Sequence, residues 1–117
     1  MTLNRPNPPP STLSGTLEAL RARYRASAPQ LAAPFRELAQ QLALDPDSLS
    51  VIEGVRAAAH RLRGTAGSYG FSQVSALAAA LEARVLAWGA GTGSELEARS
   101  RIVGDFADAL EVAFEAR

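Results

Sequence analysis

Apolar residues recur every three or four positions through most of this 117-residue chain, in runs separated by short stretches of Pro, Gly, Asp and Ser. That spacing places side chains on one face of an α-helix, whereas a half-buried strand would show alternation. Ala, Leu, Arg and Glu, which favour helices, are abundant, and β-branched and aromatic residues are sparse. The chain is therefore predicted to be all-α, and its length suits one domain whose core needs no disulfides or structural metal.

Turn-forming residues divide the chain into five predicted helices. The first helix is expected to start between residues 11 and 14 and to end at about 28, and the second runs from 29 to about 44. The third is expected from 49 to 67 or 68, the fourth from 73 to 88, and the fifth from 94 to 116. Pro29 suits the first turn of a helix, and Asp47 or Ser48 and then Ser72 are plausible N-caps. The glycines between 89 and 93 predict a flexible loop. Because these connections are short, neighbouring helices should run antiparallel and pack as a bundle.

The N-terminal segment, residues 1–11, is rich in proline and contains the run Pro8-Pro9-Pro10. Proline lacks an amide N–H and restricts φ, so this segment is predicted to be a flexible, extended arm in front of a domain at residues 12–117. A ligand for a proline-reading module is the less favoured interpretation, because no flanking specificity residue stands out.

Composition excludes several functions. The 12 basic residues balance the 12 acidic ones, so no overall charge would recruit nucleic acid or an anionic membrane. With no Cys and one His, thiolate and all-His metal sites are excluded, and no cofactor is expected on this chain. The chain lacks a P-loop, a bilayer-length apolar run and a secretion signal, so we expect a cytoplasmic monomer without an ATP site. The acidic side of the last predicted helix is interpreted as a solvated face; its members are Asp105, Asp108, Glu111 and Glu115.

The single histidine, His60, lies in the third predicted helix. At 100° per residue, the apolar residues of this helix form one stripe within roughly 40° of Leu62. They are Val51, Val55, Ala58, Leu62, Ala66 and Tyr69. On the same mapping His60 lies roughly 160° from Leu62, so its imidazole is predicted to face solvent.

Two arginines share the face of His60, because Arg56 and Arg63 stand at −4 and +3. A neutral imidazole is a competent nucleophile near neutral pH. Phosphoryl transfer also requires a positively charged group next to the negatively charged oxygens of the transferred phosphoryl group. Arg63 could supply that charge. Arg56 is open to two interpretations, a contact with a partner protein or a surface ion pair with Glu53 or with a neighbouring helix.

Two glycines, Gly64 and Gly67, lie on the same face at +4 and +7. Each costs about 0.5–1 kcal/mol relative to Ala inside a helix. Gly67 could simply mark the end of the helix, but the apolar pattern continues past Gly64. A residue that destabilises its own helix without improving local packing indicates a functional site. We interpret the two glycines as bare backbone that lets a partner protein approach His60.

The string from Ala59 to Gly70 resembles the signature of histidine-phosphotransfer domains, His-x-Leu-Lys-Gly-Ser/Ala-Ala/Ser with a Gly at +10. The directly matching positions are His60, Leu62, Gly64, Ala66 and Gly70. Arg63 replaces the usual Lys and keeps its charge, and Thr65 replaces a small residue. Further along, Leu77 and Leu81-Glu82 resemble the leucine-rich helix of the family, which ends in Leu-Glu.

The resemblance implies an antiparallel four-helix bundle with an additional N-terminal helix and an exposed, phosphoryl-accepting His60. It implies reversible transfer between this His and an Asp on a receiver domain, with Mg²⁺ on the receiver rather than on this chain. The partners would be a receiver, a histidine kinase, or both. A kinase dimerisation helix is disfavoured because no acidic residue and Pro follow His60. Two alternatives remain: a helical module that binds or inhibits a kinase or receiver without turnover, and a generic helical adaptor.

Overall fold

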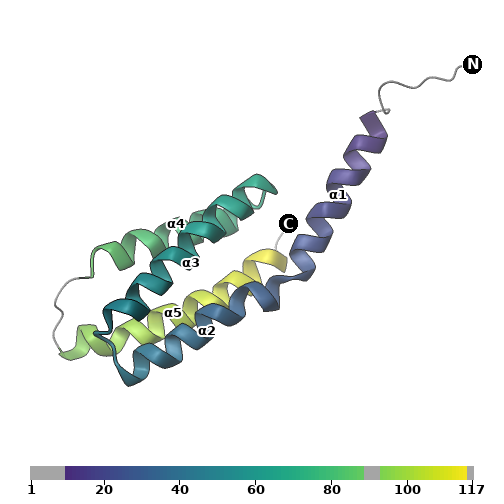
Figure 1. Cartoon of the computed structure of the whole chain (residues 1–117). Coiled ribbons are helices and arrows are strands. Elements are labelled where there is room, and N and C mark those ends of the chain that lie inside the picture. The colour runs from purple at the N-terminus through teal and green to yellow at the C-terminus, as the bar shows by residue number, and fades with distance from the viewer. Residues whose placement is uncertain (1–9, 89–92, 116–117) are drawn as a thin grey trace, which may run out of the picture.

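A computed structural model describes residues 10–88 and 93–115 of the chain. Five helices follow one another, namely α1 (Pro10–Ala26), α2 (Ala28–Leu44), α3 (Leu49–Ser68), α4 (Ser72–Leu86) and α5 (Gly93–Glu115), and no strand occurs within the described ranges. Figure 1 shows α3 beside α4 and α2 beside α5, with α1 projecting from one end of the bundle. The predicted all-α bundle is confirmed, and α1 is the additional N-terminal helix.

The helix boundaries lie close to those predicted from sequence. Ser48 is the N-cap of α3, and its hydroxyl accepts a hydrogen bond from the Val51 amide at 3.4 Å. Pro29 lies in the first turn of α2, where its missing N–H leaves no hydrogen bond unmade. The prediction that Ser72 caps α4 is wrong, because Ser72 is already helical and Phe71 occupies the N-cap without a side-chain hydrogen bond.

Some sequence predictions fall on residues outside the described ranges. They concern the proline-rich arm over residues 1–9, the glycine-rich loop over 89–92, and the end of the last helix at 116. Within the described part, helix α1 already begins at Pro10 and α5 at Gly93. None of the described helices is long and apolar enough to cross a membrane.

The buried face of α3 differs slightly from the predicted stripe. Val55, Ala59, Leu62 and Ala66 are buried, whereas three members of the predicted stripe, Val51, Ala58 and Tyr69, are only partly buried. Because Ala59 rather than Ala58 is buried, α3 is rotated about its axis relative to the predicted orientation. The rotation is toward α4, the helix with which α3 packs most extensively. This rotation turns the side of α3 that carries His60 toward the edge of α4.

Helix α3 ends in a Schellman turn. The Phe71 amide donates to Ala66 O at 2.9 Å, and the Gly70 amide donates to Gly67 O at 3.0 Å. Gly70 adopts φ +83°, a left-handed conformation that glycine reaches without a steric penalty. The turn sets the angle at which α4 returns along α3 and so positions the residues of α4 that face His60.

Replacing Gly70 with Ala is expected to lower the free energy of unfolding by about 1–2 kcal/mol, the cost of a left-handed conformation for a residue with a Cβ. A Cβ at Gly70 would meet its nearest neighbour, Arg21 Nε, at an ordinary 3.7 Å, so strain rather than a clash is responsible. Urea denaturation measures the change. Gly104→Ala inside α5 is the matched control, since its Cβ would lie 3.9 Å from Ala39 Cβ and it should not destabilise. Equal stability of both variants would contradict the prediction.

Candidate phosphoryl-accepting site

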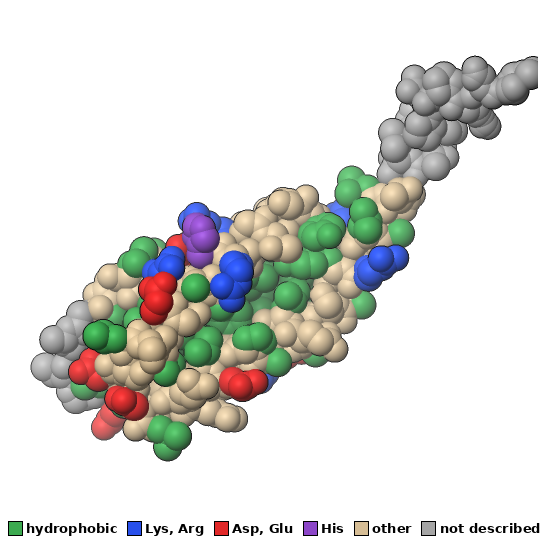
Figure 2. Space-filling model, viewed as in Figure 1, with side chains coloured by type: hydrophobic (Ala, Val, Ile, Leu, Met, Phe, Trp, Pro, Cys, Tyr) green, Lys and Arg blue, Asp and Glu red, His purple; other side chains and the backbone are tan. Residues whose placement is uncertain are grey.

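The imidazole of His60 lies on the surface of the bundle. Its side chain is 56% exposed, although the preceding residue, Ala59, is fully buried. Figure 2 shows the histidine, in purple, rising from the surface beside arginine and acidic side chains. The helical period of α3 accounts for this position, because His60 lies nearly opposite the buried Leu62.

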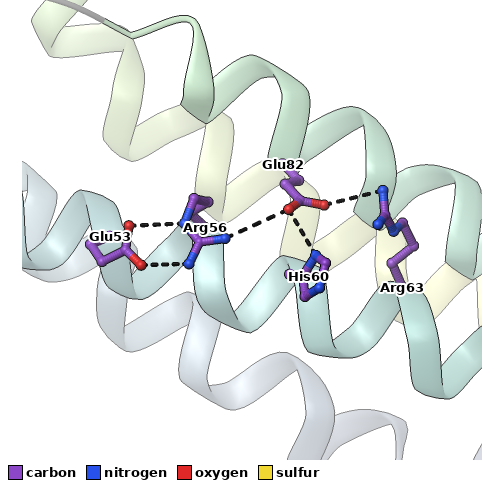
Figure 3. Close-up of polar contacts among 5 residues, drawn as sticks. All are labelled: Glu53, Arg56, His60, Arg63 and Glu82. Carbon is purple, nitrogen blue, oxygen red and sulfur yellow. Dashed lines mark hydrogen bonds and ion pairs between the residues drawn. The ribbon is translucent and has the colours of Figure 1, made fainter.

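A buried carboxylate from the neighbouring helix holds one side of the ring. Glu82 Oε2 lies 2.9 Å from His60 Nδ1, and the Glu82 side chain is only 10% exposed (Figure 3). Glu82 stands four residues after Ala78 and next to Leu81, both buried, so α4 carries the carboxylate on its packed side. A buried carboxylate needs partners, and the partners of Glu82 come from α3.

Arg63 approaches the other oxygen of this carboxylate. Its Nη1 lies 3.4 Å from Glu82 Oε1, within ion-pair range but without hydrogen-bond geometry, and the buried Oε1 has no hydrogen bond among the described residues. The Arg63 side chain is 46% exposed and stands one turn from His60. The guanidinium is therefore held loosely, and it can reach a charged group placed on the imidazole.

Arg56 is bound more tightly than Arg63. It donates to both oxygens of Glu53, from Nε at 2.9 Å and from Nη2 at 2.5 Å, and its Nη1 lies 3.7 Å from Glu82. The hydrogen bond from Arg56 holds the pKa of Glu53 below its usual value, and the same bond raises the pKa of Arg56. Of the two interpretations from sequence, the structure contains the ion pair with Glu53. Arg56 and Arg63 therefore contact the Glu82 carboxylate from opposite sides (Figure 3).

The two glycines have different surroundings. A Cβ added at Gly64 would meet nothing within 4 Å, so no packing within the described structure explains a glycine there. A Cβ at Gly67 would lie 3.4 Å from Ser75 Oγ, which donates a hydrogen bond to Arg63 O at 2.9 Å. Gly67 therefore lies at the contact between α3 and α4, a position that the sequence alone did not reveal. Gly64 remains the open position beside His60.

Comparison with known families agrees with this geometry. The family model described as Hpt domain matches residues 19–116, which is most of the chain and includes every residue of the site. The chain belongs to the Hpt family. No curated protein and no solved structure shows significant similarity to it. The resemblance seen in the sequence is confirmed, and an Hpt domain is a phosphotransfer module of two-component signalling that interacts with receiver domains and kinases.

The Hpt fold brings four residues together at the site, three from α3 and one from α4. The three from α3 were predicted from the sequence. His60, Arg56 and Arg63 share one side of α3, as their spacing predicted, whereas the role of Glu82 was missed. A signal was present: Glu82 falls on the apolar stripe of α4, and a charge on a buried stripe needs an explanation. Among the described residues of this Hpt domain, no cluster of His and acidic side chains could hold a metal ion.

Proposed function

We propose that this Hpt domain carries a phosphoryl group on His60, accepting it from a histidine kinase or its receiver domain and passing it to an Asp of a response regulator. The observation that supports this most strongly is the pairing of an exposed imidazole with a buried carboxylate at Nδ1. The domain would act as a carrier without an ATP site of its own, and Mg²⁺ would be bound by the partner receiver.

The carboxylate selects the reacting nitrogen. A carboxylate can only accept a hydrogen bond, so in the contact with Glu82 the ring proton is on Nδ1 and points at Oε2. The lone pair is then on Nε2, which has no hydrogen-bond partner among the described residues. Nε2 is therefore the nucleophile of the proposed reaction.

In the transfer, Nε2 attacks the phosphorus of an aspartyl phosphate. The N–P bond forms as the P–O bond to the aspartate breaks, and the aspartate leaves as a carboxylate. The imidazole ring becomes positively charged because it keeps its Nδ1 proton, and Glu82 stabilises that charge. The reverse steps return the phosphoryl group to an acceptor Asp.

The surrounding residues would assist transfer in two ways. Arg63, one turn from His60 and loosely held, donates to the phosphoryl oxygens. Arg56, Gly64 and Gly67 line the surface that the partner covers, with Arg56 also keeping Glu82 in place and Gly64 leaving open space for the approach.

Phosphotransfer from a labelled, phosphorylated receiver tests the proposal directly. We expect the chain to acquire label that is stable in alkali and labile in acid, as a phosphoramidate should be, and to lose it to fresh receiver. A chain that binds the receiver but acquires no label would instead be an interaction module without turnover, and the proposal would be wrong.

Glu82→Gln is expected to slow transfer about tenfold, which corresponds to the loss of one charge-assisted hydrogen bond of about 1.5 kcal/mol. An amide can donate as well as accept, so it no longer keeps the proton on Nδ1. Nitrogen-15 NMR of the imidazole should show mainly the Nδ1–H tautomer in the wild type and a mixture in the variant. Glu53→Gln is the control, because Glu53 touches Arg56 and not the ring. An unchanged tautomer and rate in Glu82→Gln would remove Glu82 from the mechanism.

A further inference from the structure

Helix α4 makes polar contacts with α3 at two levels of the described structure. At one level Glu82 contacts the His60 ring, and at the other the hydroxyl of Ser75 donates to the backbone carbonyl of Arg63 at 2.9 Å. Seven residues separate Ser75 from Glu82, so both lie on the same side of α4, about 10 Å apart along its axis. The Ser75 contact therefore joins the two helices close to the site without touching the imidazole.

Apolar packing between α3 and α4 leaves their axial register weakly specified. Ala59 and Ala66 on α3 and Ala78 on α4 are fully buried, and these two helices pack extensively against each other. A methyl group forms only a shallow ridge, so it opposes sliding of one helix along another less than a long side chain that enters a groove. A directional polar contact can specify register where apolar packing does not.

We propose that Ser75 is a positioning residue for phosphotransfer, because its hydrogen bond to Arg63 O sets the register in which Glu82 meets Nδ1 of His60. The anchored carbonyl belongs to the residue one turn from His60, so the register is fixed close to the reacting ring. Hydrogen bonds depend on alignment, and a small axial shift of α4 would weaken the contact between Glu82 Oε2 and Nδ1. The inference rests on the proposed function for its effect on rate.

The other helix pair of the bundle contains a contact of the same kind. Ser100 of α5 donates from its hydroxyl to Ala39 O of α2 at 2.7 Å, and Figure 1 shows these two helices side by side. Neither α2 nor α5 carries a residue of the site. Ser100→Ala is therefore a matched control for Ser75→Ala, since each variant loses one serine hydroxyl that donates to a carbonyl of the neighbouring helix.

Nitrogen-15 NMR of the imidazole and phosphotransfer from a labelled receiver test Ser75→Ala. We expect a smaller share of the Nδ1–H tautomer and transfer about threefold slower, a smaller effect than that of Glu82→Gln because the contact is weakened rather than removed. Alanine favours helix more than serine, so the variant should fold. Ser100→Ala should keep the wild-type tautomer and rate. An unchanged tautomer in Ser75→Ala, or the same shift in Ser100→Ala, would overturn the proposal.

A double variant, Ser75→Ala with Glu82→Gln, tests whether Ser75 acts through Glu82. If it does, the double variant should transfer at the rate of Glu82→Gln alone, because the contact that Ser75 positions is already lost. A further threefold loss in the double variant would mean that the two residues act independently, and the proposal would be wrong. A wild-type chain that acquires no label would reject the proposed function, whereas the tautomer measurement, which needs no phosphoryl group, would still decide the role of Ser75.

Discussion

His60→Gln is expected to abolish phosphoryl incorporation from a phosphorylated receiver, because His60 is the only imidazole in the chain and an amide nitrogen is not a nucleophile near neutral pH. We expect the free energy of unfolding to change by no more than about 0.5 kcal/mol, as for most substitutions at exposed positions. The Gln amide can still donate to Glu82, so the buried carboxylate keeps a partner.

Receiver binding and phosphotransfer must be measured on the same His60→Gln preparation. Retained receiver binding with no label would place the defect in the chemical step. Arg61→Gln is the neighbouring control, since Arg61 is exposed on α3 and the contacts to Glu82 come from Arg56, His60 and Arg63. Label of wild-type intensity on His60→Gln would assign the acceptor to another residue and reject the proposed function.

Gly64→Leu is expected to reduce the rate of transfer by about a hundredfold, the typical cost of misplacing a reacting group by about 1 Å. The new side chain would occupy open space one turn after His60, where the partner must approach. The same change should raise the free energy of unfolding by about 0.5–1 kcal/mol, because Leu favours helix more than Gly and no neighbour is close enough to clash.

This combination of higher stability and lower activity separates a role in access from a role in packing. Transfer rates and urea denaturation should be compared with those of Gly15→Leu, a glycine in α1 with equally open surroundings but far from His60. That control should keep its transfer rate. Unimpaired transfer in Gly64→Leu would show that the partner does not need the bare backbone, and a loss of stability would show that Gly64 is required for packing.

The helices were predictable because their signals are local. Pro29 marks the start of α2, Ser48 caps α3, and Gly70 takes the left-handed conformation that ends it. The cap of α4 was predicted wrongly for a physical reason: Ser72 has the chemistry of an N-cap, but the Schellman turn after α3 already commits Phe71 to that position. Local preference was overridden there by the end of the preceding helix.

By itself, the sequence determined that α3 is a helix and that His60, Arg63 and Gly64 share its outer side, because a period of 3.6 residues relates neighbours along a single helix. Only the tertiary structure decided that Glu82 holds Nδ1 of His60 and that Gly67 lies against Ser75. Both facts depend on how far α3 is rotated and shifted against α4. The exact rotation and shift are set by the packing of two faces against each other, and residue spacing along one helix locates the packed face but not its register against α4.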